Sequence, residues 1–174
     1  MGRLDGKVAI ITGGARGQGA AEARLFVREG ARVVFGDILD DEGKSLEAEI
    51  READGEATYV HLDVTKTEDW RAAIELAEGR YGNLNILVNN AAILIPKGVE
   101  ETTSEEWDRV MGVNAKGVFL GTKEAIPSMR RAGGGSIVNI SSIAGLGANP
   151  RGGGGIAYTA SKGAVRLFTK ATAI

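Results

Sequence analysis

Short apolar runs alternate with longer amphipathic stretches along this chain of 174 residues. The runs have the length and composition of buried strands, and in the stretches between them apolar residues recur at helical spacing. The predicted strands cover residues 7–12, 32–37, 57–62, 84–89 and 136–141. The predicted helices cover residues 17–29, 40–53, 67–81, 103–132 and 157–174. Because helical crossovers join parallel strands, the pattern predicts an α/β fold with a parallel sheet.

Local sequence signals set several of these boundaries. Gly30 suits the end of the first helix, and Thr67 suits the N-cap of the third. Thr103 and Glu106 have the spacing of a capping box, which predicts the start of the long fourth helix. The run Gly152–Gly155 predicts a flexible surface loop. We find no linker or internal repeat, so we expect a single domain over residues 1–174.

The first predicted strand leads into a glycine-rich turn. Gly13, Gly17 and Gly19 have the spacing G-x-x-x-G-x-G and lie where the strand passes into the start of the first predicted helix. Backbone N–H groups and the helix dipole attract an anion at such a turn, and the missing Cβ atoms let a pyrophosphate approach. The common dinucleotide fingerprint is G-x-G-x-x-G, so by itself the turn fits a plain tight turn as well as a nucleotide site.

Composition narrows the range of functions. Hydrophobic residues make up 43% of the chain and charged residues 25%, as in ordinary globular proteins. The net charge of −2 gives no basic footprint for nucleic acid. The chain has no cysteine and one histidine, which excludes disulfides and a Cys nucleophile and argues against a metal site. Without a signal peptide or a long apolar run, we expect a cytoplasmic protein with no membrane partner.

Tyr158 and Lys162 form a candidate acid/base pair. They are four residues apart in the last predicted helix and therefore share one face. A lysine ammonium close to a phenol favours the phenolate, which makes a tyrosine usable as an acid/base near neutral pH. Such a tyrosine could take a proton from a hydroxyl group of a substrate. Such a pair is more often a packed ring beside a solvated charge, so its interpretation depends on the other motifs.

Further motifs follow the predicted strands in chain order. They are Asp37, Asp63-Val64, Asn89-Asn90-Ala91-Ala92, Val113-Asn114-Ala115-Lys116-Gly117, Ile140-Ser141-Ser142 and Tyr158-Thr159-Ala160-Ser161-Lys162. Together with the glycine turn, they resemble the short-chain dehydrogenase/reductase family over essentially the whole chain. The segments 61–65 and 134–142 are most similar to the NAD-dependent 3α,20β-hydroxysteroid dehydrogenase type.

The resemblance implies a fold and a reaction. The fold is a Rossmann-like, doubly wound parallel sheet with the strand order 3-2-1-4-5. The reaction is hydride transfer between NAD(H) and a secondary alcohol or ketone, such as a steroid or another apolar cyclic alcohol. Ser142 would bind the substrate oxygen, Asn114 would hold a water in a proton relay to Lys162, and Lys162 would also bind the nicotinamide ribose. Relatives pair through the long helix and the last helix, which implies a homodimer or homotetramer.

The resemblance also implies a set of cofactor contacts. They are Gly13, Arg16, Gly17, Gln18, Gly19, Asp37, Asp63, Val64, Asn90, Ala91, Tyr158 and Lys162. An acid at Asp37 would accept the adenosine ribose hydroxyls and repel a 2′-phosphate, which favours NAD over NADP. Arg16 argues the other way, because a base in the glycine turn can meet that phosphate. Simpler roles stay open: Asp37 as a turn residue, Ser142 as a cap and Asp63 as a strand-end cap. His61 is expected to have no role.

Three features depart from the family pattern. Ala92 stands where the family usually has glycine. The segment from Ser142 to Tyr158 is longer than usual over Arg151–Gly155, which leaves the substrate class open. Family members also continue beyond the position of Ile174 with two more strands, a nicotinamide-holding loop and a substrate lid. We therefore expect the fifth strand to be an apolar edge and the chain to be part of a longer protein.

Two alternative functions were weighed. If the 174 residues are the whole molecule, we expect weak NAD binding and little turnover, as in a non-catalytic nucleotide-binding or scaffold protein. A sugar-nucleotide epimerase or dehydratase is disfavoured, because those relatives carry T-G-x-x-G-x-x-G. The turn here has one more residue between its first two glycines.

Overall fold

A five-stranded parallel sheet forms the centre of the molecule in the computed structural model, which describes residues 2–147 and 155–173. Its strands are β1 (Val8–Thr12), β2 (Arg32–Asp37), β3 (Ala57–His61), β4 (Ile86–Asn89) and β5 (Ser136–Asn139). The order β3-β2-β1-β4-β5 confirms the predicted Rossmann-like topology. The helices are α1 (Gly17–Arg28), α2 (Asp40–Glu52), α3 (Thr67–Tyr81), α4 (Ser104–Met111), α5 (Gly117–Arg131) and α6 (Ile156–Thr172).

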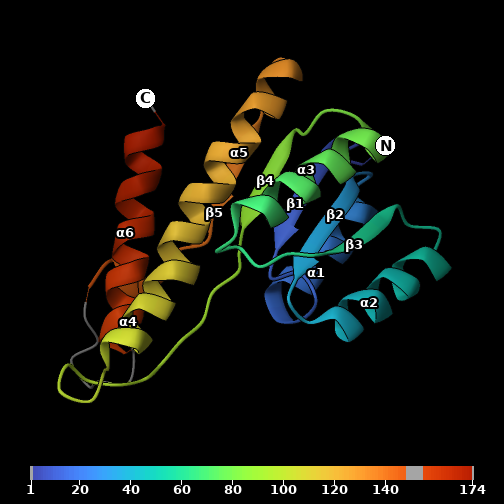
Figure 1. Ribbon diagram of the computed structural model, residues 1–174. Coiled ribbons are helices and arrows are strands. Elements are labelled where there is room, and N and C mark those ends of the chain that lie inside the picture. The colour runs from blue at the N-terminus through green and yellow to red at the C-terminus, as the bar shows by residue number, and fades with distance from the viewer. Residues whose placement is uncertain (1, 148–154, 174) are drawn as a thin grey trace.

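Helices cover both faces of the sheet (Figure 1). The central strand β1 is buried on both faces along its whole length, and its first four residues are apolar. Val8 and Ile10 pack with α3 and α5, whereas Ala9 and Ile11 pack with α1 and α2. Full burial of a side chain such as Ile10 contributes about 1.5–3 kcal/mol. Two separate apolar clusters therefore hold the sheet rigid beneath its carboxyl edge.

The long helix predicted over residues 103–132 is interrupted. A π-helical turn, Gly112–Lys116, joins α4 to α5, and Asn114 within it is 1% exposed. Such a turn contains an extra residue, which hydrophobic periodicity does not reveal. Gly117 lets the helix approach the segment that follows β3, because a Cβ there would lie 2.9 Å from Cγ2 of Val64. The prediction of one continuous helix is wrong, and the interruption places Asn114 in the interior.

Two helix starts were predicted from their caps, with different outcomes. The capping box of α4 is confirmed, since Oγ1 of Thr103 accepts from the backbone N of Glu106 at 3.2 Å and Oε2 of Glu106 accepts from Thr103 N at 3.1 Å. Thr67 was expected as the N-cap of α3 and is instead its first helical residue. Lys66 occupies the cap position, because the turn before it closes through a hydrogen bond from Lys66 N to Asp63 O.

The strands are shorter than predicted at some ends, and β5 forms an edge of the sheet as expected. β4 begins at Ile86, β5 ends at Asn139, and Val138 on this edge is 42% exposed. Apart from Gly155, the predicted loop Gly152–Gly155 lies outside the described residues, as does most of Arg151–Gly155.

No helix within residues 2–147 and 155–173 is long and apolar enough to cross a membrane.

Candidate nucleotide site and catalytic cluster

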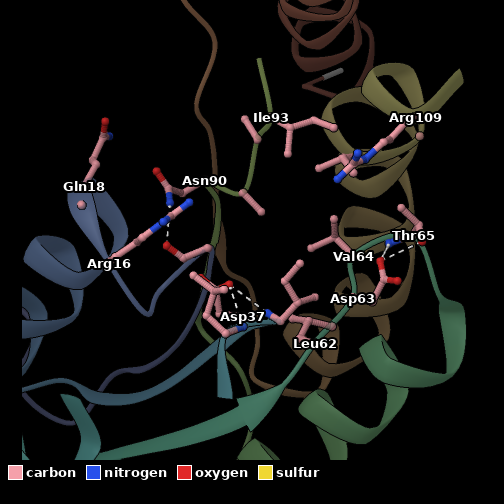
Figure 2. A pocket seen from close by; sticks show the side chains of 18 of the residues that line it. Arg16, Gln18, Asp37, Leu62, Asp63, Val64, Thr65, Asn90, Ile93 and Arg109 are labelled. Carbon is pink, nitrogen blue, oxygen red and sulfur yellow. Dashed lines mark hydrogen bonds between the residues drawn. The ribbon is translucent and has the colours of Figure 1, made fainter. Parts of the chain in front are cut away.

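A cavity of about 800 Å³ opens at the carboxyl edge of the sheet. It brings together all the predicted cofactor residues except Gly19, Tyr158 and Lys162. Figure 2 shows Arg16 and Gln18 on one side of it and Asp63 and Arg109 on the other. The space therefore lies between the glycine turn after β1 and the segments that follow β3 and β4.

The glycine turn has its shape because of where side chains are missing. Gly13 and Gly17 have φ values of 64° and 57°, in the left-handed region that side chains disfavour. A Cβ on Gly19 would overlap the carbonyl oxygen of Gly13. Gly19 is thus needed to close the turn and does not line the cavity. No side chain among the described residues caps α1, so its first N–H groups are available to an anion.

Asp37 ends β2 with its carboxylate fixed at the cavity. Its Oδ1 accepts from the backbone N of Ile38 at 2.8 Å and of Leu39 at 3.2 Å. Its Oδ2 accepts from Ala15 N in the glycine turn at 3.1 Å. The acid is therefore more than a turn residue, because it also connects the turn to the end of β2. Its remaining lone pairs can accept hydrogen bonds from the hydroxyl groups of a ligand.

Asn90 and Thr12 hold the segment that follows β4. Oγ1 of Thr12 accepts from the backbone N of Asn90 at 3.0 Å and of Ala91 at 3.1 Å. The side-chain amide of Asn90 donates to Thr12 O at 2.9 Å. Asn90 thus lines the cavity while its amide supports the turn. Thr12 was not predicted as a site residue, although its place directly before the first glycine was a usable signal.

Asp63 presents an ionised carboxylate near Val64. Oδ1 accepts from the backbone N of Thr65 at 3.0 Å and from its hydroxyl at 2.7 Å, and Lys66 Nζ lies 3.8 Å from Oδ2. Partial burial opposes ionisation, but these hydrogen bonds and the lysine charge outweigh it and lower the pKa of Asp63. Asp63 can cap the end of the strand and also contact a ligand, because it lines the cavity.

Lys162 lies at the centre of a second cluster, beside the end of β5. Its side chain is 3% exposed, and Nζ donates to the carbonyl oxygen of Ile140 at 2.6 Å. Oγ of Ser141 donates to the carbonyl oxygen of Lys162 at 2.8 Å. Nζ lies 5.7 Å from the centroid of the Tyr158 ring, which confirms that the two share one helical face. Burial lowers the pKa of Lys162.

Residues 7–174 match the family model described as short chain dehydrogenase. The chain belongs to the short-chain dehydrogenase family. It is 52% identical to a 3-alpha-(or 20-beta)-hydroxysteroid dehydrogenase of Mycobacterium tuberculosis, over 99% of this chain and 64% of that protein. It is 48% identical to a cyclopentanol dehydrogenase of Comamonas testosteroni, over 100% and 68% respectively. A trans-4-hydroxycyclohexanecarboxylate dehydrogenase of Sinomonas cyclohexanicum is 46% identical, over 99% and 67%.

The chain spans about two thirds of the length of these short-chain dehydrogenases. Dehydrogenases of this family use nicotinamide cofactors. The residues present fit the adenosine and pyrophosphate parts of such a cofactor. The glycine turn is closely packed at Gly19, where a Cβ would not fit. No side chain among the described residues caps the start of α1, and the Asp37 carboxylate faces the cavity.

Asn114 connects the cavity to the second cluster. Its Oδ1 accepts from the backbone N of Ile93 at 2.8 Å, and its Nδ2 donates to Ile93 O at 2.9 Å and to Ser161 Oγ at 3.0 Å. Ile93 lines the cavity, and Ser161 belongs to α6 with Tyr158 and Lys162. The side chain of Asn114 is thus occupied by protein partners. Its role in holding a water stays a prediction.

Ser142 begins the short 3₁₀ turn Ile143–Gly145, which packs against α6. Its Oγ accepts from Ala144 N at 3.1 Å, so the capping role is real. The hydroxyl proton can still be donated to a substrate oxygen, because the cap uses a lone pair. None of Asn114, Ser142, Tyr158 and Lys162 lines the large cavity.

Several cavity residues were missed from the sequence. They are Ile38, Leu39, Leu62, Thr65, Ala92, Ile93, Asp108, Arg109, Gly112 and Val113. Most of them neighbour a predicted residue, and that adjacency was the available signal. Asp108 and Arg109 come from α4 and had no such signal, since they reach the cavity only through the tertiary placement of α4.

Proposed function

We propose that this protein is an oxidoreductase that transfers hydride between NAD(H) and a secondary cyclic alcohol or ketone. The observation that carries the proposal is the buried Lys162 beside Tyr158, connected through Asn114 to a cavity lined by the glycine turn and Asp37. The names of the relatives support an enzyme over a scaffold, because they are dehydrogenases of cyclic or steroid alcohols.

Each residue of the second cluster has a distinct task in the proposed reaction. The nicotinamide, when bound, supplies the hydride acceptor or donor. Tyr158 takes the proton of the alcohol, and the ammonium of Lys162 attracts the negative charge that develops on the ring oxygen. Ser142 donates its hydroxyl proton to the substrate oxygen. The bond from Lys162 Nζ to Ile140 O keeps the ammonium in place.

Exposed apolar side chains near Ser142 support an apolar substrate. Ile143 is 87% exposed and Leu146 69%, and Leu94 after β4 is 52% exposed. Both segments follow the carboxyl ends of strands, where ligands of open α/β sheets bind. A cyclic hydrocarbon skeleton would cover such side chains, and each buried CH₂ would contribute about 0.8 kcal/mol.

NAD is the proposed cofactor rather than NADP. The Asp37 carboxylate is held by three backbone N–H groups, so it cannot swing away from a 2′-phosphate without losing them. Arg16 lines the same cavity and is the one predicted residue that favours a phosphate. We expect Asp37→Ala to relax discrimination against NADP, measured as the ratio of the two dissociation constants. An unchanged ratio would mean that Asp37 does not select the cofactor.

The proposed activity is tested by incubating the protein with NAD and a panel of alcohols, including cyclopentanol, cyclohexanol and a 3α-hydroxysteroid. The reduced-nicotinamide absorbance reports turnover. We expect Tyr158→Phe to abolish the signal while cofactor binding is unchanged. Thr159→Ala, on the neighbouring residue of α6, is the control. Retained turnover in Tyr158→Phe would contradict the assignment of the acid/base.

A homo-oligomer through the long helix and the last helix is also proposed. On these helices, Val110, Val118 and Val165 are buried within the chain. Phe119 is 45% exposed and Leu167 63%. These two side chains are available to a second copy. Sedimentation of Leu167→Asp should show a smaller species than the unaltered protein, and an unchanged sedimentation coefficient would contradict the interface.

A further inference from the structure

Tyr59 on the edge strand β3 has a ring that is fixed from two sides. Its centroid lies 5.8 Å from that of Phe35, on the neighbouring strand β2, with the planes at 54°. On the other side lies Gly43 of α2, where a Cβ would overlap the ring. Glycine within a helix costs about 0.5–1 kcal/mol relative to alanine. Here Gly43 leaves space for the ring of Tyr59, and the Tyr59 hydroxyl group therefore has a fixed position.

The Tyr59 hydroxyl contacts the short segment between β2 and α2. The Tyr59 hydroxyl lies 2.7 Å from the backbone carbonyl oxygen of Asp37 and 2.7 Å from Oδ1 of Asp40, the first residue of α2. Nδ1 of His61 contacts the same Asp40 oxygen at 2.9 Å. A phenol has one proton, so the two acceptors share it. Burial and the Asp40 carboxylate raise the pKa of Tyr59, and the hydroxyl therefore stays a donor at neutral pH.

The segment held in this way carries part of the nucleotide site. The Asp37 carboxylate faces the cavity, and Ile38 and Leu39 line it. Their backbone N–H groups are also the donors that orient the Asp37 carboxylate. Without the shared proton, the partially negative carbonyl oxygen of Asp37 and the Asp40 carboxylate would have no donor between them and would repel each other. The turn would then lose the conformation that aligns the carboxylate.

We propose that Tyr59 is a positioning residue of the nucleotide site, whose hydroxyl holds the segment Asp37–Asp40 in the conformation that binds the adenosine ribose. The proposal rests on the proposed function, because it takes a nucleotide as the ligand of the cavity. Tyr59 touches no ligand itself and acts through Asp37. Its removal lowers the fraction of the protein in the binding conformation and weakens the apparent affinity by that fraction.

The test is calorimetric titration of the protein with ADP-ribose, which contains the adenosine and pyrophosphate parts of the cofactor. Tyr59→Phe keeps the ring and removes only the hydroxyl. We expect it to weaken the affinity for ADP-ribose by about three- to tenfold, which corresponds to the loss of one hydrogen bond. Gly43→Ala keeps the hydroxyl group of Tyr59 but displaces the ring that carries it. It should weaken binding in the same direction, and it tests the proposal independently if Tyr59→Phe does not fold.

A matched control exists on the opposite face of the same strand. The hydroxyl of Tyr81 lies 2.8 Å from Oγ1 of Thr58, the residue before Tyr59, and away from the cavity. Tyr81→Phe removes the same atom from a tyrosine whose hydroxyl also has a hydrogen-bond partner, and we expect the affinity for ADP-ribose to change by less than about twofold. Thermal unfolding of each variant separates a loss of stability from a loss of binding.

A double-mutant cycle asks whether Tyr59 acts through Asp37. In an Asp37→Asn background, Tyr59→Phe should change the affinity by less than about twofold. A full additional loss there would overturn the proposal, as would equal affinities of Tyr59→Phe and the unaltered protein. If the unaltered protein does not bind ADP-ribose, the proposed nucleotide site itself is wrong. The failures of the two proposals are thus distinguishable.

Discussion

Replacement of Asn114 by alanine is expected to destabilise the fold strongly. The side chain is 1% exposed and forms three hydrogen bonds, two to the backbone of Ile93 and one to Ser161. Ser161 keeps a partner in the variant, because its hydroxyl also donates to Tyr158 O at 2.7 Å. The backbone N–H and C=O of Ile93 lose the partner that joins them to the π-helical turn.

The magnitude follows from those two groups. A buried polar group left without its partner costs about 1–3 kcal/mol, so two such groups give about 2–6 kcal/mol before relaxation. Because the segment after β4 can move and admit water, we expect a loss of about 3 kcal/mol in the free energy of unfolding. For a domain of this size that corresponds to a fall of about 6–12 °C in Tm.

Urea unfolding followed by circular dichroism measures the loss. Asn83→Ala is the control, because Asn83 is exposed on the loop before β4 and the same atoms are removed. We expect it to stay within about 0.5 kcal/mol of the unaltered protein. A loss below about 1 kcal/mol in Asn114→Ala would refute the reasoning, since the amide would then not be what joins the segment after β4 to α6.

Four further variants test other parts of the account. Gly19→Ala should destabilise the fold by about 1–3 kcal/mol and weaken ADP-ribose binding. Gly79→Ala places its methyl group in open space on α3 and should stabilise the fold by about 0.5–1 kcal/mol. Urea unfolding measures both changes. Burial lowers the pKa of Lys162 below its unfolded value of about 10.4, so the unfolded state binds more protons and stability rises as the pH approaches that value. Lys162→Met should lack this rise below about pH 10.4, and parallel curves would contradict it. Thr103→Ala should cost about 1 kcal/mol through loss of the capping box, measured by thermal unfolding, and no change would contradict its role.

The features predicted from the sequence are those with local signals. The alternation of apolar runs and helical stretches is sufficient for the parallel sheet, and glycines at fixed spacing after β1 identify the turn. Asp37 could be placed because it ends a strand that the pattern defines well. That Tyr158 and Lys162 lie on one face of their helix followed from helical geometry alone.

The features that were missed depend on contacts between distant segments. The π-helical turn at Asn114 is stabilised by Ile93 and Ser161, neither of which affects the periodicity of the helix. The role of Tyr59 depends on Gly43 in another element, so composition gives no sign of it. Thr67 was placed as a cap on residue type, but the hydrogen bonds of the preceding turn shifted the helix start.

The central claim is that the carboxyl edge of this sheet binds NAD through the glycine turn and Asp37. Calorimetric titration of the protein with NAD and, in parallel, with NADP tests it most directly. The account predicts that NAD binds at least about tenfold more tightly than NADP, equivalent to about 1.4 kcal/mol of discrimination by the carboxylate. Equal affinities, or no binding of NAD at millimolar concentration, would contradict it.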